Sequence, residues 1–431
     1  MTYRQVLEYM YSRLPMFQRI GPQAFKKDLT NTLVLCKALG DPQDAFRSVH
    51  IAGTNGKGSS SHMIASVFQK AGYKTGLYTS PHLKDFTERI RVNGRPILKS
   101  FVIRFIEKIR PHLEEIRPSF FELTVAMAFD YFRQNRVDMA VVETGLGGRL
   151  DSTNIITPEV SLITNISFDH QDMLGHSLAE IAFEKAGIIK SGVPVVIGQR
   201  HPETDPVFVK RAGELSSRVL FAEDLYEVVG KKDAPGLSEY RVKCPGSGNM
   251  MVIKSDLAGD YQVKNIPAVL AVLDVLRRKK ILIPEEAVNT GLRTVRKSTG
   301  LKGRWQVLSS DPLIICDVAH NEDGLKWVME QLGKIGRREL RIVFGMVKDK
   351  DPGPILNQLP RNARYYFCAA NIPRARNSKE LKTMAKNQGL KGKAYSSVNE
   401  AVAAAKADCR KGDVIFIGGS TFVVAEVNEL K

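Results

Sequence analysis

Residues 50–72 read HIAGTNGKGSSSHMIASVFQKAG, and the rest of the sequence is best interpreted from this stretch. Its first apolar residues predict a short buried strand that ends at Ala52, and a helical spacing of apolar residues begins near Ser59. The connecting residues are rich in glycine and contain Lys57. A strand, a glycine-rich loop and a helix in this order are typical of a phosphate-binding loop, in which backbone N–H groups, the helix N-terminus and the lysine contact phosphate oxygens.

The loop departs from the general pattern G-x-x-x-x-G-K-[ST]. Ile51 occupies the position of the first glycine, and Gly58 follows the lysine, so that the hydroxyl group moves to Ser59. An ordinary glycine-rich turn therefore stays open as an alternative when the loop is considered alone.

Segments of continuous apolar character recur along the chain and alternate with helical patterns. The predicted strands of the first half are residues 49–52, 75–78, 139–142, 161–164 and 193–197. Apolar strands separated by helices predict a parallel sheet covered on both faces. The polar, basic segment 293–307 precedes a second alternation of strands and helices. We therefore predict an α/β fold with an ATP-binding domain over residues 1–296 and a smaller α/β domain over residues 297–431.

The composition limits the classes of function. Lys and Arg outnumber Asp and Glu by 63 to 46, and a net charge of +17 suits nucleic acid, a membrane surface or small polyanionic ligands. The basic clusters lie at predicted helix ends, where cations offset the helix dipole, so we expect no nucleic-acid partner. The five cysteines are widely spaced, as in reduced cytosolic proteins, and no apolar run approaches the roughly 20 residues of a membrane span. We expect a cytoplasmic monomer that does not bind membranes.

Polar side chains follow several predicted strands directly. Ser80, Glu143, Asp169 and His170 all come just after such strands, and ligands of open α/β sheets bind at this edge. A carboxylate and a hydroxyl group beside nucleotide phosphates suit Mg²⁺, whereas imidazole is a less usual ligand of this ion. Each residue also has a simpler interpretation: Ser80 as a turn residue before Pro81, Glu143 as a charge at a strand end, and His170 as a helix cap.

The same residues belong to longer motifs, found in order along nearly the whole chain. These motifs are HIAGTNGKGSSSHMIASVFQKAGYKTGLYTSPHL, FTERIRVNGRPI, VVETGLGGRLDSTN, NISFDHQDMLG, FEKAGIIK, DVAHNEDG, VFGMVKDKD and IGGSTFVVAE. Together they resemble the bacterial dihydrofolate synthase and folylpolyglutamate synthase family of the Mur ligase superfamily. The resemblance implies a P-loop, parallel-sheet domain followed by a smaller Rossmann-like domain. It also implies a ligase that forms C–N bonds by adding L-glutamate to dihydropteroate or folate through an acyl phosphate, with release of ADP and phosphate.

The resemblance also implies roles for individual residues. The ATP-binding residues of the loop would be Thr54, Asn55, Gly56, Lys57, Gly58 and Ser59. Ser80 and Glu143 would hold one Mg²⁺, and Glu143 and His170 would share a second with Lys185. An ammonium group does not bind a metal, but in the family this lysine is carbamylated, and the carbamate is an oxygen ligand. Unmodified, Lys185 would be a helical surface lysine or would pair with phosphate. Lys57, Glu143, His170 and Lys185 are thus the expected catalytic group.

Other family positions extend the expected site into both domains. Asn265, Arg304 and Asp317 match contacts with ATP, while His320 and Ser420 match motifs near the glutamate site. The pteridine-bearing substrate would contact two segments, which are Phe120, Phe121 and Glu122, and Leu150, Asp151 and Ser152. Phe120 and Phe121 would equally suit a hydrophobic core, and His320 would equally suit a helix cap. Lys302, Glu322 and Asp323 depart from the residues common in the family.

Two other classes of function compete with a folate ligase. A cell-wall amino-acid ligase of the same superfamily needs a sizeable N-terminal domain, but only about 50 residues precede the phosphate loop. A P-loop protein that acts on nucleic acid is favoured only by the net charge, because the sequence lacks interleaved aromatic and basic residues.

Overall fold

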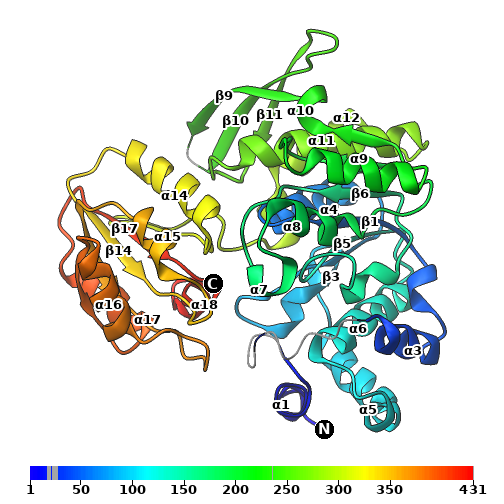
Figure 1. The fold of residues 1–431 in the computed structure, drawn as a ribbon, viewed down its shortest axis with the longest axis horizontal. Coiled ribbons are helices and arrows are strands. Elements are labelled where there is room, and N and C mark those ends of the chain that lie inside the picture. Colours follow the sequence, from blue (N-terminus) through cyan, green and yellow to red (C-terminus); the bar gives the residue numbers. More distant parts are fainter. Residues whose placement is uncertain (17–20, 22–27, 235, 431) are drawn as a thin grey trace. The chain divides into compact units, whose positions relative to one another are not determined.

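The computed structural model describes residues 1–16, 21, 28–234 and 236–430. The chain forms two compact units, drawn in Figure 1. Unit 1 comprises Met1–Asp256 and Gln262–Leu301, and unit 2 comprises Leu257–Tyr261 and Lys302–Lys431. The chain therefore enters unit 2 for five residues, returns to unit 1, and leaves it finally after Leu301.

Unit 1 is built on an eight-stranded sheet. In spatial order its strands are β4 (Arg95–Pro96), β3 (Ile90–Val92), β2 (Thr75–Tyr78), β5 (Met139–Glu143), β1 (Arg47–Ala52), β6 (Val160–Ile163), β7 (Val195–Ile197) and β8 (Val219–Phe221). The six strands from β2 to β8 pair in parallel, as predicted, and β3 and β4 add an antiparallel edge. All five predicted strands of this half overlap observed ones.

Helices cover both faces of this sheet. They are α1 (Tyr3–Arg13), α3 (Thr30–Ala38), α4 (Lys57–Lys70), α5 (Lys99–Ile116), α6 (Phe120–Gln134), α7 (Gln171–Leu174), α8 (Leu178–Ala186), α9 (Asp205–Glu214), α10 (Ala222–Leu225), α11 (Gln262–Arg278), α12 (Glu285–Arg293) and α13 (Val295–Thr299), with 3₁₀ turns η2 (Pro42–Asp44), η3 (Phe86–Arg89) and η4 (Ser152–Ile155). Helices α4 and α11 pack on the sheet, and α12 and α13 pack against α4.

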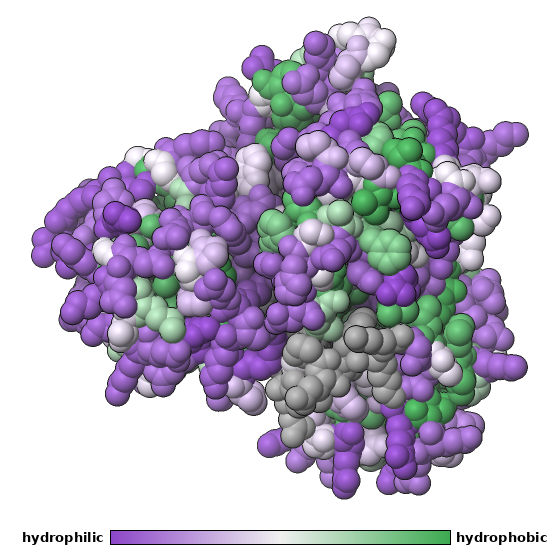
Figure 2. All heavy atoms as spheres, in the orientation of Figure 1, coloured by the Kyte–Doolittle hydropathy of each residue, from purple (hydrophilic) through white to green (hydrophobic). Residues whose placement is uncertain are grey.

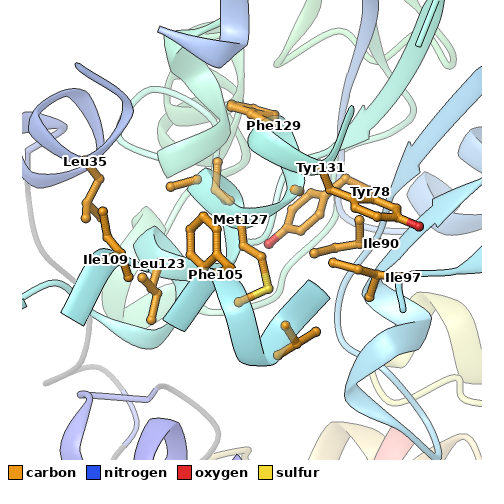
Figure 3. Close-up of a cluster of buried hydrophobic side chains, with 14 of the residues drawn as sticks. Leu35, Tyr78, Ile90, Ile97, Phe105, Ile109, Leu123, Met127, Phe129 and Tyr131 are labelled. Carbon is orange, nitrogen blue, oxygen red and sulfur yellow. The ribbon is translucent and has the colours of Figure 1, made fainter. Parts of the chain in front are cut away.

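The strand register explains how the opposite face is filled. Tyr78, Val142 and His50 are register partners across β2, β5 and β1, so their side chains point to the same face. Tyr78 and Val142 belong to a core cluster with the apolar side chains of α5 and α6, part of which is shown in Figure 3. Ala52 and Ile163 continue this face and pack with residues of α8 and α9.

The helix after the phosphate loop begins two residues earlier than predicted. Its first residue is Lys57, and Gly56 caps it in the left-handed conformation, with φ 85°. Glycine adopts this conformation without the steric cost of a Cβ, so the helix can begin immediately after it. The apolar spacing of the sequence becomes visible only one turn later, which is why Ser59 marked the expected start.

A three-stranded antiparallel sheet was not predicted. It consists of β9 (Glu227–Ala234), β10 (Leu237–Lys243) and β11 (Met250–Ser255), and it packs against α11 and α12. Alternate residues of β10 are buried, among them Tyr240 and Val242, whereas the residues between them are polar or charged. Such strands lack the continuous apolar runs by which the parallel strands were found.

Unit 2 contains a six-stranded sheet. Its strands in spatial order are β12 (Gln306–Ser310), β13 (Leu313–Cys316), β17 (Val414–Gly418), β14 (Leu340–Phe344), β15 (Ala363–Phe367) and β16 (Lys391–Ala394). Its helices are α14 (Glu322–Lys334), α15 (Pro352–Asn357), α16 (Ser378–Asn387), α17 (Val398–Ala407) and α18 (Thr421–Glu426). All neighbouring pairs are parallel except β12 with β13, so this unit has the predicted α/β class.

Residues Leu257–Tyr261 attach to unit 2 through α14. Gln331 bonds in both directions, since its Oε1 accepts from the Asp260 N–H at 2.7 Å and its Nε2 donates to the Ala258 carbonyl oxygen at 2.9 Å. Lys334 Nζ lies 2.8 Å from Asp260 Oδ2. Three side-chain contacts therefore hold a segment whose flanking residues both belong to unit 1.

The visible face of the molecule is mainly hydrophilic, as Figure 2 shows. In the part of the chain that the structure describes, no helix has both the length and the apolar character needed to cross a membrane.

Candidate active site

The loop between β1 and α4 contains two glycines whose backbone conformations other residues rarely adopt. Gly53 and Gly56 have φ values of 145° and 85°. A Cβ on Gly53 would lie 1.9 Å from Thr164 Oγ1, and one on Gly56 would lie 2.3 Å from Asn265 Oδ1. The backbone of the loop is therefore in close contact with the end of β6 and with α11. The structure places Asn265, a predicted ATP contact, beside this loop.

Hydrogen bonds from the chain after β6 hold the loop in place. The Thr54 and Asn55 N–H groups donate to the carbonyl oxygen and to Oδ1 of Asn165, at 3.0 and 2.8 Å. Thr164 Oγ1 donates to the Asn55 carbonyl oxygen at 2.6 Å. Contacts within the protein thus fix the shape of the loop, and a fixed loop loses less conformational entropy when it binds a ligand.

Lys57 folds back over its own loop. Its Nζ donates to the carbonyl oxygens of Gly53 and Thr54, at 2.9 and 3.1 Å. The ammonium group therefore lies at the helix N-terminus, where positive potential is already concentrated. A phosphate bound at this helix N-terminus would therefore lie close to the Lys57 ammonium group.

Lys185 reaches the same loop from α8. It is 3% exposed, and its Nζ donates to the Gly53 carbonyl oxygen at 2.9 Å. Burial and the neighbouring Lys57 lower the pKa of Lys185 to about 7, against the opposing effect of Asp169 and Asp151. A large fraction of this amine is consequently neutral near pH 7. Because its side chain is buried, Lys185 is not the surface lysine that the sequence left open as an alternative.

Three of the predicted metal ligands follow strands from the middle of the sheet of unit 1. Glu143 ends β5, is buried, and is the register partner of Ile51, two residues before Gly53. Ser80 follows β2, on the other side of β5, and His170 follows β6, on the other side of β1. The sheet order therefore places the loops that carry these residues at one edge.

The predicted set does not form a preassembled cluster of acidic and imidazole ligands. Among the residues that the structure describes, no group of three or more His, Cys, Asp or Glu side chains is arranged to hold a metal. His170 has a positive φ of 51° at the N-cap of α7, but its ring makes no capping hydrogen bond. Its Nε2 lies 3.9 Å from Asp169 Oδ1.

Asp151 organises the loop that follows β5. Its Oδ2 accepts from the N–H groups of Gly145 and Leu146 at 2.8 and 2.9 Å, and its Oδ1 accepts from the Thr153 N–H and hydroxyl groups at 3.0 and 2.5 Å. Burial raises the pKa of Asp151, and these hydrogen bonds act in the opposite direction. The neighbouring Leu150 is half-buried and Ser152 is buried.

The segment Phe120, Phe121 and Glu122 divides into three different roles. Phe120 is a core residue, 3% exposed, whereas Phe121 is half-buried, with its ring centroid 6.1 Å from that of Tyr78. Glu122 closes a capping box at the start of α6, since its Oε2 accepts from the Ser119 N–H at 2.6 Å. Of the three, Phe121 has the exposed surface that a substrate ring would need.

The sequence interpretation missed Arg89. This residue is 3% exposed, its guanidinium carbon lies 5.3 Å above the ring of Phe120, and its Nε donates to His82 Nδ1 at 2.8 Å. Burial lowers the pKa of Arg89, and burial together with Arg89 lowers that of His82 to about 3. No carboxylate of the described residues forms an ion pair with Arg89. A buried guanidinium that forms no ion pair with a described carboxylate, above the ring of Phe120, is a candidate anion site.

In unit 2, Asp317 follows β13 and is fully buried. Its Oδ2 accepts from the Tyr261 hydroxyl and the Trp305 N–H, both at 2.7 Å, and its Oδ1 accepts from the Ala319 N–H at 2.8 Å. Burial raises the pKa of Asp317, while the positive charge of Arg304 opposes this shift. The structure thus brings Arg304 and Asp317 together within this unit.

His320 and Ser420 follow β13 and β17, which are adjacent parallel strands. His320 Nδ1 lies 2.9 Å from the Val318 carbonyl oxygen, and Asn321 caps α14 instead, accepting from the Gly324 N–H at 2.9 Å. Ser420 caps α18 by accepting from the Phe422 N–H at 3.1 Å. The two residues share one edge of the sheet, and His320 is not the helix cap.

Two family descriptions match most of the chain. Residues 51–273 match the Mur ligase middle domain, and residues 303–421 match the glutamate ligase domain of Mur ligases. The first match spans the phosphate loop, Glu143, His170 and Lys185, and the second spans Arg304, Asp317, His320 and Ser420.

Individual relatives extend the similarity over the whole chain. The dihydrofolate synthase/folylpolyglutamate synthase of Bacillus subtilis is 30% identical, with 99% of each chain covered. A probable bifunctional folylpolyglutamate synthase/dihydropteroate synthase of Haloferax volcanii is 32% identical over 99% of this chain, which spans 50% of that relative. The structure of Escherichia coli FolC in complex with DHPP and ADP is similar with a TM-score of 0.86 and 27% identity, covering 100% of this chain and 97% of the other.

Proposed function

Because the chain belongs to the folylpolyglutamate synthase and dihydrofolate synthase family of Mur ligases, we propose that it joins L-glutamate to a pteroate or folate acceptor in a reaction driven by ATP. The observation that carries this proposal is the convergence of Lys57 and Lys185 on one carbonyl oxygen of the loop between β1 and α4. A cation at the helix N-terminus suits the terminal phosphates of a nucleotide.

The reaction begins with activation of the acceptor. An oxygen of its carboxylate attacks the γ-phosphorus of ATP, the bond to the β-phosphate oxygen breaks, and ADP leaves. The amine of L-glutamate then attacks the carbonyl carbon of the acyl phosphate and loses a proton, and phosphate departs as the amide forms. Both steps bring anions together, so they depend on positive charge around the phosphates. Lys57 supplies that charge from this chain.

The residues present fit a magnesium site with one modification. Ser80 and Glu143 would hold one ion, and Glu143 and His170 would hold a second together with a carbamate on Lys185. Lys185 supports this assignment because its pKa of about 7 leaves a neutral amine that can add CO₂. Mg²⁺ would neutralise phosphate charge, and carboxylate, hydroxyl and carbamate oxygens are the hard ligands that it prefers.

The remaining assignments rest on the family resemblance. Asn265 and the loop residues Thr54 to Ser59 of unit 1 would contact ATP, and Arg304 and Asp317 of unit 2 match contacts with ATP in the family. His320 and Ser420 would bind the incoming L-glutamate. Phe121, Leu150 and Ser152 would contact the pteridine-bearing acceptor, and Arg89 supplies an additional buried cation on that side.

The test is ADP release with ATP, Mg²⁺ and L-glutamate, in parallel reactions with 7,8-dihydropteroate, with tetrahydrofolate and without acceptor. Release with both acceptors would mean a bifunctional enzyme, and release with one would identify the single activity. Each reaction is repeated without L-glutamate, because amide formation requires the amine. ADP release that no acceptor stimulates would contradict the proposed ligase and leave only an ATPase.

A further inference from the structure

A buried hydrogen-bond chain connects β1 to the β5 loop, defined as residues 144–151. It begins at His50, which is fully buried in β1, three residues before Gly53. His50 Nε2 lies 2.8 Å from the hydroxyl oxygen of Thr153, a fully buried residue of η4. A polar pair in such a place must satisfy its donors and acceptors internally.

Counting hydrogens determines the direction of the chain. The Thr153 hydroxyl has one hydrogen, and Asp151 Oδ1, at 2.5 Å, is the acceptor that takes it. The hydroxyl oxygen therefore accepts from His50, which assigns the His50 proton to Nε2. Burial and Lys190 lower the pKa of His50 to about 3, so the ring is neutral near pH 7. His50 Nδ1 is buried and has no hydrogen-bond partner. This agrees with the assigned tautomer, in which Nδ1 carries no hydrogen.

Asp151 carries the chain into the β5 loop. Its second oxygen accepts from the N–H groups of Gly145 and Leu146. Gly145 in turn lies against Phe121, because a Cβ at this position would be 2.4 Å from the Phe121 ring. Four hydrogen bonds occupy the Asp151 carboxylate, and one of them depends on the side chain of Thr153.

Unit 1 contains a second buried histidine and threonine pair, in which the threonine hydroxyl donates to a different kind of acceptor. His62 Nδ1 lies 2.7 Å from Thr299 Oγ1, and this hydroxyl donates to the Val295 carbonyl oxygen of its own helix. The Thr299 hydroxyl therefore donates to the backbone of a helix. The Thr153 hydroxyl instead donates to the Asp151 carboxylate, which orders a loop beside Phe121.

We propose that Thr153 and His50 are positioning residues for the acceptor, because they orient Asp151 and thereby hold the β5 loop against Phe121. This inference rests on the proposed function, since the acceptor is the pteroate or folate of that reaction. Among the described residues, neither His50 nor Thr153 has a side-chain hydrogen bond to the phosphate loop or to Lys57, so removal of the pair should weaken acceptor binding and leave ATP binding nearly unchanged.

The experiment compares Thr153→Val, which removes only the hydroxyl group, with Thr153→Ser, which keeps it. Steady-state rates give the KM for the acceptor and for ATP. Thr153→Val should raise the acceptor KM about tenfold, the usual effect of losing a hydrogen bond to a charged group, with the ATP KM changed less than about twofold. Thr153→Ser should restore most of the loss, and Thr299→Val serves as the matched control with both KM values unchanged.

Three outcomes would overturn the inference: an unchanged acceptor KM in Thr153→Val, equal increases for acceptor and ATP, or the same effect in Thr299→Val. A readout without turnover separates this inference from the proposed function. Hydrogen exchange of the Gly145 and Leu146 amides should accelerate in Thr153→Val and not in Thr299→Val, even if no folate acceptor is used. Unchanged exchange would contradict the role of Thr153, whereas accelerated exchange in an enzyme that uses no folate would leave the loop contact standing and reject the proposed acceptor.

Discussion

Lys57 and Lys185 donate to the same carbonyl oxygen, that of Gly53, each at 2.9 Å. Two like charges this close disfavour one another, and Lys57 is one of the causes that lower the pKa of Lys185. Lys57, at the helix N-terminus, is less buried than Lys185. The two side chains thus meet at one carbonyl oxygen of the loop, and Lys185 is the one whose pKa is lowered to about 7.

Replacing Lys57 tests the phosphate site. Lys57→Ala should lower kcat/KM for ATP by about a hundredfold or more, the typical effect of removing one group that stabilises transition-state charge. Lys279→Ala is the control, because this lysine pairs with Glu159 on the surface of the same unit. ADP release and binding of a non-hydrolysable ATP analogue should be measured for both. Full activity of Lys57→Ala would refute the assignment of the loop.

Lys185 should respond to CO₂. Its pKa is lowered, so the protonated fraction, which does not add CO₂, grows as the pH falls through about 7. Activity after CO₂ removal should therefore fall most on the acid side, and added bicarbonate should restore it. NMR with ¹³C-bicarbonate should show a carbamate carbonyl signal that is absent from Lys185→Ala. Activity that is insensitive to CO₂, without this signal, would count against the modification.

Arg89 should separate stability from activity. A buried guanidinium without a carboxylate partner destabilises the fold, so Arg89→Met should leave Tm unchanged or raise it. The acceptor KM should nevertheless rise about tenfold or more if this cation binds the acceptor. Arg91→Met is the control, because Arg91 is also buried and donates to the Gly94 carbonyl oxygen. A large loss of Tm in Arg89→Met with an unchanged KM would mean a structural role.

Stability should depend on pH through His50. The pKa of His50 is about 3 in the folded protein and 6.5 when unperturbed, so between these values the unfolded chain binds a proton that the folded protein does not. The free energy of unfolding then falls by about 1.4 kcal/mol for each pH unit below 6.5. From pH 7 to pH 5, wild type should lose about 2 kcal/mol relative to His50→Gln.

Urea unfolding at the two pH values measures this difference. The exposed His112 gives a control, since His112→Gln should follow the wild type at both pH values. Parallel losses in wild type and His50→Gln would show that His50 already takes up its proton in the folded protein.

The sequence predicted the elements whose signals are local. The strand before Gly53 is predicted from apolar residues interrupted only by His50, and the strand before Glu143 from a continuous apolar run. Because parallel strands end at one edge of a sheet, the sequence could nominate Glu143 and His170 as candidates for that edge.

Other features depend on contacts between distant residues, which leave no periodic signal. Arg89 forms no ion pair with a carboxylate of the described residues, and its neighbours His82 and Phe120 come close to it only through the fold. Likewise, Asp151 was found as part of a motif, but its hydrogen bonds to the β5 loop and the connection to His50 follow from the folded backbone.

The attachment of Leu257–Tyr261 to α14 has a consequence for protein engineering. A gene fragment that starts at Lys302 would encode the whole sheet of unit 2 but would omit the partners of Gln331 and Lys334, as well as the Tyr261 hydroxyl that bonds Asp317. Chimaeras with a relative should therefore exchange these five residues together with residues 302–431. The two segments that must be exchanged together, residues 257–261 and 302–431, are therefore separated in the gene.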